Sequence, residues 1–110
     1  NMDISIDLRY FRQISFGNQE IEKEMFLSWK EDSFKRISDL QILLEEQNQK
    51  NIFNSVHALK TNFSMVDCYA GIKFCELLID KIQKGEIIDS TAVRELDCII
   101  NKIIQSFSDI

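Results

Sequence analysis

The sequence of 110 residues contains no proline, three glycines and a single histidine. Because proline and glycine are the residues that most often interrupt regular structure, their scarcity favours long, continuous elements. Apolar residues recur at steps of three and four, while period-two alternation is rare, which indicates helices rather than strands. No apolar run approaches the roughly 20 residues that span a bilayer, so we expect no membrane insertion of this domain.

Positive charge is also scarce. Lys and Arg total 13 against 18 Asp and Glu, which gives a formal net charge of −5. Nucleic-acid backbones are bound by clustered cationic side chains that release counterions, and the sequence has no basic block. We therefore expect neither nucleic acid nor an anionic membrane surface as a partner.

The three cysteines do not form a recognisable metal or disulfide framework. Cys68, Cys75 and Cys98 make no C-x-x-C pair, and one histidine cannot complete the usual Cys/His zinc sets. We expect free, half-buried thiols in a reducing cytoplasm, and no metal or cofactor held by this chain.

The chain has the length of one small domain with one core, so residues 1–110 are expected to form a single domain. Apolar periodicity predicts helices over about 7–14, 19–46 and 51–66, then a helix that ends near residue 84 and a last one that begins near residue 90. Four long amphipathic helices with short connections predict an all-α fold, an antiparallel four-helix bundle with a short additional N-terminal helix.

Several residues are expected to end or begin these helices. Asp7 can cap the first helix, and Asp89, Ser90 or Thr91 the last, while Gly85 suits a C-terminal cap. The polar run over 45–51 is expected to be a turn, and a second break is expected over 67–71. Trp29 and the phenylalanines other than Phe53 follow helical apolar patterns and are predicted to lie in the core.

The helix predicted over 51–66 carries the histidine. Its apolar residues fall within about 40° of one line when each residue turns the helix by ~100°; they are Ile52, Val56, Leu59, Phe63 and Val66. His57 lies roughly 140° from that line, and Phe53, Lys60, Thr61 and Ser64 share its outward half. His57 is therefore expected to face water, which suits either an ordinary surface residue or a reactive one.

The chemistry of these side chains suits phosphoryl transfer. A solvent-exposed imidazole is largely uncharged and nucleophilic at neutral pH, and histidine forms covalent intermediates. Lys60, one turn after His57, brings a positive charge that suits phosphoryl oxygens. The sequence has no glycine-rich nucleotide loop, so a nucleophilic His57 must receive its phosphoryl group from another protein.

Residues 56–63, V-H-A-L-K-T-N-F, resemble the pattern A-H-x-L-K-G-S-A of the histidine phosphotransfer (HPt) domains of multistep two-component phosphorelays. Residues 8–29, LRYFRQISFGNQEIEKEMFLSW, resemble the opening helix, glycine-containing turn and second helix of that family. Residues 70–86, AGIKFCELLIDKIQKGE, resemble the segment that usually follows, with its aliphatic-Cys-x-x-Leu stretch. The resemblance spans nearly the whole chain.

The resemblance implies that His57 is the phosphoacceptor of a cytoplasmic relay. Its outer ring nitrogen would take the group from the aspartate of a response-regulator receiver domain and pass it to another receiver, while Lys60 would steady the phosphoryl oxygens. Phe53 would form an apolar seat for a helix of the receiver, or pack beside the bundle. Asn54 and Ser64 would lie at the partner-binding rim, or simply be solvated. The divalent cation would belong to the receiver, no kinase activity is implied, and the domain could be free-standing or the C-terminal part of a hybrid histidine kinase.

The sequence departs from the family pattern at two positions. Thr61 stands where the family usually has glycine and would place a β-branched side chain in the partner-binding surface, beside the imidazole. Asp67 stands where a second glycine is common, and we expect it to alter the turn more than the chemistry. Two alternatives remain: a non-catalytic interaction module with a degenerate HPt fold that binds a receiver without phosphotransfer, and an unrelated helical bundle for oligomerisation or scaffolding.

Overall fold

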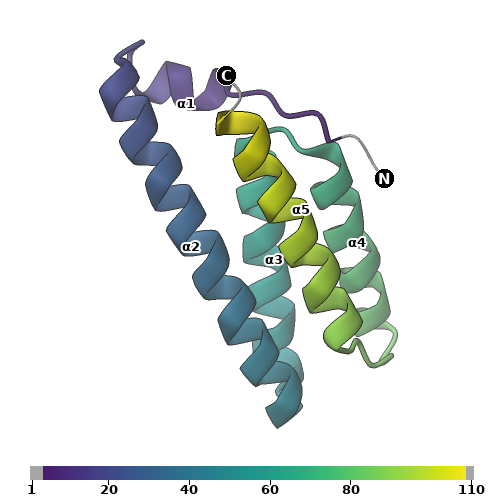
Figure 1. Ribbon diagram of the computed structural model, residues 1–110. Coiled ribbons are helices and arrows are strands. Elements are labelled where there is room, and N and C mark those ends of the chain that lie inside the picture. The colour runs from purple at the N-terminus through teal and green to yellow at the C-terminus, as the bar shows by residue number, and fades with distance from the viewer. Residues whose placement is uncertain (1–3, 109–110) are drawn as a thin grey trace.

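The computed structural model describes residues 4–108, which form helices and no strands (Figure 1). The helices are α1 (Arg9–Ile14), α2 (Gln19–Glu46), α3 (Gln49–Met65), α4 (Tyr69–Gln83) and α5 (Ser90–Ser108). Helices α2 to α5 run alternately up and down; each packs on the next, and α5 packs back on α2. Helix α1 crosses one end of this bundle. The predicted all-α, antiparallel four-helix bundle with a short N-terminal helix is confirmed.

The bounds of α2 agree with the prediction, but the turn that follows is shorter than predicted. Gln47 adopts a left-handed conformation, with φ of 55°, and Asn48 caps α3 by accepting a hydrogen bond from the Asn51 N–H at 3.2 Å. Residues 45–46 and 49–51 are therefore helical, and the prediction of a turn over the whole of 45–51 is wrong. Asparagine is a strong N-cap, which explains why α3 begins so early.

Helix α1 begins at Arg9 rather than at Asp7. The Asp7 carboxylate accepts a hydrogen bond from the Arg9 N–H at 2.8 Å, so Asp7 still satisfies a free donor at the start of the helix. The Asp7 N–H donates to the carbonyl oxygen of Val66 at 2.8 Å, which fastens the N-terminal segment to the end of α3. Asp7 therefore makes the predicted capping bond, although it lies one residue further from the helix than an N-cap residue does.

The break between helices is shorter than the predicted range 67–71, because α4 already begins at Tyr69. Asp67 has φ of 50°, so it occupies the left-handed region that favours glycine. Gly71 lies inside α4 and is buried; a Cβ atom at this position would overlap the Phe63 ring of α3. Gly71 therefore serves the close approach of α3 and α4 and does not interrupt the chain.

The connection from α4 to α5 follows the predicted capping pattern. Gly85 has φ of 77°, and the N–H groups of Gly85 and Glu86 donate to the carbonyl oxygens of Ile82 and Lys81. These two bonds satisfy carbonyls that the end of α4 leaves free. At the start of α5, Asp89 is the residue that caps, since its carboxylate accepts from the Thr91 N–H at 2.9 Å.

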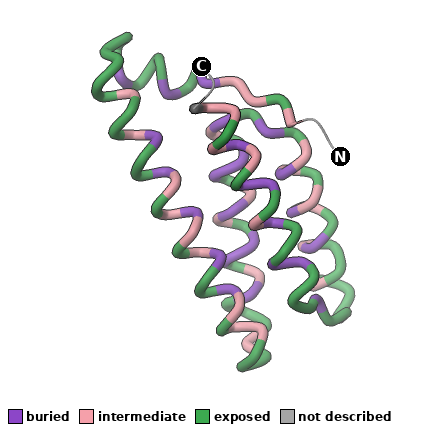
Figure 2. Tube along the Cα trace, viewed as in Figure 1, coloured by how far each residue is buried: buried purple, intermediate pink, exposed green. Residues whose placement is uncertain are grey.

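The core lies between the four long helices (Figure 2). The predicted apolar stripe of α3 is fully buried, with every member 0–1% exposed: Ile52, Val56, Leu59, Phe63 and Val66. Trp29 is also buried, as predicted. Phe16 contradicts the prediction that the phenylalanines lie in the core, because it is 94% exposed. It lies in the turn after α1 with φ of 53°, immediately before Gly17, and this turn directs it into solvent.

The cysteines are free, and two of the three are buried. Burial raises the pKa of the Cys68 thiol, and it raises the pKa of Cys75 to about 12. Cys98 on α5 is exposed. Both buried sulfurs therefore act as neutral parts of the core rather than as reactive thiolates. Among residues 4–108, no helix combines the length and the apolar character needed to cross a membrane.

Candidate functional site

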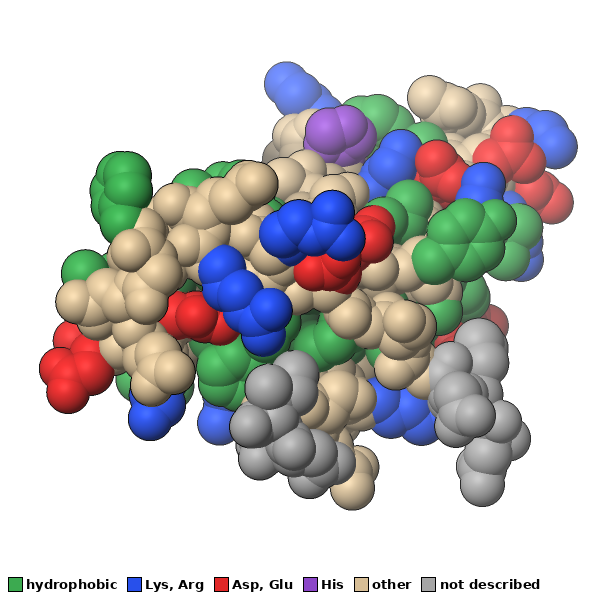
Figure 3. All heavy atoms as spheres, turned by 90° about the horizontal axis from the view of Figure 1, so that it is seen from above, with side chains coloured by type: hydrophobic (Ala, Val, Ile, Leu, Met, Phe, Trp, Pro, Cys, Tyr) green, Lys and Arg blue, Asp and Glu red, His purple; other side chains and the backbone are tan. Residues whose placement is uncertain are grey.

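His57 lies near the middle of α3, on the side away from the buried stripe, and is exposed. Figure 3 shows its side chain at the surface of the bundle, with basic and acidic side chains close by in that view. The imidazole lies one turn after Phe53, and the two rings stack with centroids 6.1 Å apart and planes 29° apart. The predicted exposure of His57 is confirmed, and Phe53 is half-buried beside it.

Lys60 lies one turn after His57 on the same side of α3, but its ammonium group is engaged by another helix. Its Nζ lies 3.2 Å from Oε2 of Glu76 on α4. The other carboxylate oxygen of Glu76, Oε1, lies 3.2 Å from Nζ of Lys73, which belongs to α4 as well. Hydrogen bonds from Lys60 and then Lys73 hold the pKa of the Glu76 carboxyl below its ordinary value.

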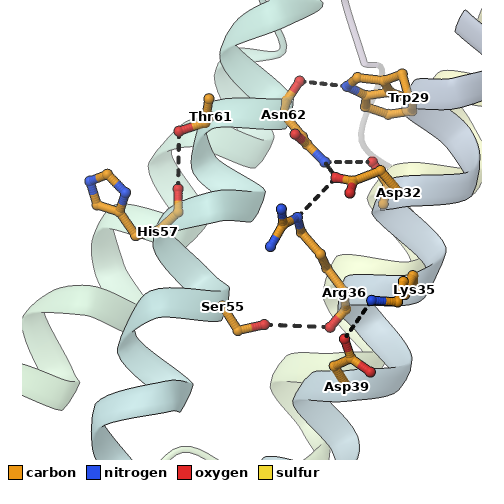
Figure 4. A network of polar contacts seen from close by, with 10 residues as sticks. Trp29, Asp32, Lys35, Arg36, Asp39, Ser55, His57, Thr61 and Asn62 are labelled. Atoms are coloured by element: carbon orange, nitrogen blue, oxygen red, sulfur yellow. Dashed lines mark hydrogen bonds and ion pairs between the residues drawn. The ribbon is translucent and has the colours of Figure 1, made fainter.

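Thr61 is exposed one turn beyond His57. Its hydroxyl Oγ1 donates to the carbonyl oxygen of His57 at 3.3 Å, so the side chain bonds back to the turn that carries the imidazole (Figure 4). Ser64 is exposed and makes the same kind of bond, from its Oγ to the carbonyl oxygen of Lys60 at 3.0 Å. Asn54 is exposed as well. The structure thus gathers the predicted residues on one side of α3, with Thr61 adding bulk next to His57.

A second polar cluster joins α3 to α2 and was not anticipated from the sequence (Figure 4). The buried Asn62 donates from Nδ2 to Oδ2 of Asp32 at 2.8 Å and to Oγ of Ser33 at 3.0 Å. The Trp29 indole N–H donates to the carbonyl oxygen of Asn62 at 2.7 Å. Arg36 donates from Nε to the same Asp32 oxygen at 2.9 Å. Four side chains of α2 are therefore fixed around one residue of α3.

The charge of Asp32 is stabilised by these contacts. Burial alone would raise the pKa of the Asp32 carboxyl, but the hydrogen bonds from Asn62 and Arg36 outweigh burial and hold the pKa below its ordinary value. The cluster therefore keeps a carboxylate at the α2–α3 interface at neutral pH. A sequence signal for it did exist, because Ser33 fills an apolar position of α2 and Asn62 follows Leu59 at a helical step.

Among the described residues, no other group of side chains forms a candidate active site as well defined as the one around His57. Residues 4–108 contain no group of three or more His, Cys, Asp or Glu side chains that could hold a metal ion. A shallow, mainly apolar groove of about 490 Å³ runs along α1, α2 and α3, with Ile21, Met25 and Met65 in its lining, and it does not include His57.

Comparisons of the chain with protein-family models, with curated proteins and with solved structures found no match. His57 and the side chains around it are therefore the features of this chain from which a function can be inferred.

Proposed function

We propose that this domain is a cytoplasmic phosphorelay intermediate in which His57 carries a phosphoryl group between the aspartates of two response-regulator receiver domains. The observation that supports the proposal is the position of the imidazole, exposed on a helix whose opposite side is anchored in the core. A partner's aspartyl phosphate can approach such a ring without any rearrangement of the bundle. The relay could belong to a free-standing protein or be tethered to a hybrid histidine kinase.

The reaction needs a nucleophile and a receiver, and no nucleotide site on this chain. The lone pair of the unprotonated outer ring nitrogen of His57 attacks phosphorus, the P–O bond to the receiver aspartate breaks, and the carboxylate leaves. The second transfer reverses these steps on the next aspartate. The divalent cation that assists both steps belongs to the receiver.

Each side chain next to His57 has a role in the proposed transfer. Phe53 stacks beside the imidazole and offers an apolar surface against which a receiver can pack. Asn54 and Ser64 are exposed at the rim of the site. Lys60 lies within one turn of His57 and supplies the charge that phosphoryl oxygens require.

The direct test is transfer from a phosphorylated receiver domain. A receiver carrying labelled phosphate and Mg²⁺ is mixed with the wild-type domain, with His57→Gln and with Asn101→Gln, an exposed position of α5, as the control. We expect label on the wild type and on Asn101→Gln, in a bond that is labile in acid and stable in base, and no label on His57→Gln. Since the chain has one histidine, the phosphohistidine signature assigns the site directly.

A second candidate function is a non-catalytic module that binds a receiver without accepting phosphate. Two observations favour it: Thr61 adds a side chain beside the imidazole, and Lys60 is already paired with Glu76. Receivers that bind the wild type and leave it unlabelled would establish this alternative. Receivers that neither bind nor label it would favour an unrelated helical scaffold.

A further inference from the structure

Lys60 has two possible anionic partners, and its present partner is on a different helix. The Lys60 side chain is 33% exposed and reaches from α3 to Glu76 on α4, at 3.2 Å. Its helical neighbour at i−3 is His57, so the same ammonium group also lies within reach of a group bound to the imidazole. A phosphoryl group on His57 would bring about −1.5 to −2 charges into this space.

Glu76 can release Lys60 without losing all of its charge compensation. Its second oxygen is held by Lys73 at 3.2 Å, within α4 itself, and that pair does not involve α3. Both pairs are partly exposed to solvent and so individually weak. The nearby Cys75 does not compete for the cation, because burial raises the pKa of its thiol to about 12 and keeps it neutral. Lys60 can therefore exchange between Glu76 and a phosphoryl group at little cost.

We propose that Glu76 is a positioning residue that competes with the phosphoryl group on His57 for the Lys60 ammonium. The inference rests on the proposed function and adds to it a control on how firmly the phosphoryl group is held. With Glu76 present, Lys60 divides its time between two anions, so the phosphohistidine is held less tightly and is more readily passed on. Without Glu76, Lys60 would pair with the phosphoryl group continuously.

To test this, the purified domain is phosphorylated without any partner protein. Phosphoramidate serves as the donor: the imidazole nitrogen attacks phosphorus, the P–N bond breaks and ammonia leaves. The pKa of the phosphoryl group on His57 is then followed by ³¹P NMR. A cation held close to the phosphoryl group favours its dianion and lowers that pKa.

Substitutions of Glu76 and of Asp80, each made in the wild type and in a Lys60→Met background, separate the role of Lys60 from simple removal of charge. Glu76→Gln is expected to lower the phosphoryl pKa by about 0.5 unit relative to wild type, in proportion to a surface ion pair. The same substitution made in a Lys60→Met background should shift it by less than about 0.2 unit, since no ammonium remains to be released. Asp80→Asn removes a carboxylate one turn along α4 that pairs with Lys84, and should have no effect that depends on Lys60.

The outcomes distinguish this inference from the function on which it rests. A Glu76→Gln shift that is equal in both backgrounds, or absent from both, overturns the inference while phosphorylation of His57 itself stands. If phosphoramidate leaves the wild-type histidine unlabelled, the proposed function fails and the inference fails with it. Glu76 is 41% exposed, so thermal unfolding within a few degrees of wild type is expected and confirms that the comparison is made between folded proteins.

Discussion

Helix α3 meets its two neighbours through unlike sets of polar contacts. Toward α2, the buried Asn62 joins the carboxylate of Asp32 and the hydroxyl of Ser33 in bonds of 2.8 and 3.0 Å. Toward α4, Lys60 reaches Glu76 across a surface where both side chains remain in contact with water. We call the first interface closed because Asn62 and Ser33 are buried, although Asp32 at its edge is 45% exposed, and we call the second exchangeable because both of its ions are partly exposed.

The difference in burial has a direct energetic meaning. A buried hydrogen-bonding group that loses its partner pays the full cost of desolvation, whereas exposed ions can return to water. The α2–α3 contacts therefore fix where α3 lies, and with it the direction in which His57 points. The α3–α4 contacts leave a charge beside His57 that is free to respond to what binds there.

The largest effect is expected from breaking the closed interface. Asn62→Ala removes the donor to Asp32 and to the buried Ser33, and should lower the free energy of unfolding by about 2–3 kcal/mol. Denaturant unfolding measures it. Asn54→Ala, on the exposed side of the same helix, serves as the control and should change stability by less than about 0.5 kcal/mol. Equal losses in the two variants would show that the network adds nothing to stability.

The next effect concerns the exchangeable interface. Lys60→Ala should slow phosphoryl transfer from a receiver by about tenfold, because one charge near the phosphoryl oxygens is lost, and should change stability by less than about 1 kcal/mol. Rapid-mixing kinetics with Lys50→Ala as the control would measure the effect. Unchanged transfer in Lys60→Ala would remove the role proposed for this lysine.

A smaller effect is expected in the pH dependence of the closed interface. The pKa of Asp32 is lowered from 3.8 in the folded state, so its contribution is present at neutral pH and is lost as pH falls through the folded-state pKa. Because the Asp32 side chain is 45% exposed, that contribution should stay below about 1 kcal/mol. The stability difference between wild type and Asp32→Asn, measured by denaturant at pH 7 and pH 3, should shrink at the lower pH. A difference that grows would reverse the assigned sign.

The smallest effect is expected at Thr61. Thr61→Gly removes the side chain next to His57, so transfer should be equal or up to about threefold faster, at a cost of roughly 0.5 kcal/mol in helix stability. Asn101→Gly, at an exposed position of α5, controls for the loss of helix propensity. A severe loss of transfer in Thr61→Gly alone would contradict the steric argument.

The fold could be predicted because it follows from local pattern. The step of ~100° per residue was enough to place Ile52 and Val66 in the core and His57 in solvent. The contacts of Asn62 could not be predicted, because they depend on how α2 is aligned against α3. The exposure of Phe16 depends on the turn that follows α1, which the core prediction for the phenylalanines did not take into account. The Lys60–Glu76 pair could not be predicted, since it depends on how α4 is aligned against α3, and the spacing of residues within one helix does not contain that information.

Gly71 ties the packing of the bundle to the charge beside His57. Its missing side chain lets α4 rest against the Phe63 ring, and Glu76 follows five positions later, about 7.5 Å further along the same axis. A larger residue at Gly71 would push the two helices apart and lengthen the contact between Lys60 and Glu76. The electrostatics of the imidazole's surroundings thus depend on the close contact of Gly71 with Phe63 in the interior, where a methyl group would act as a spacer.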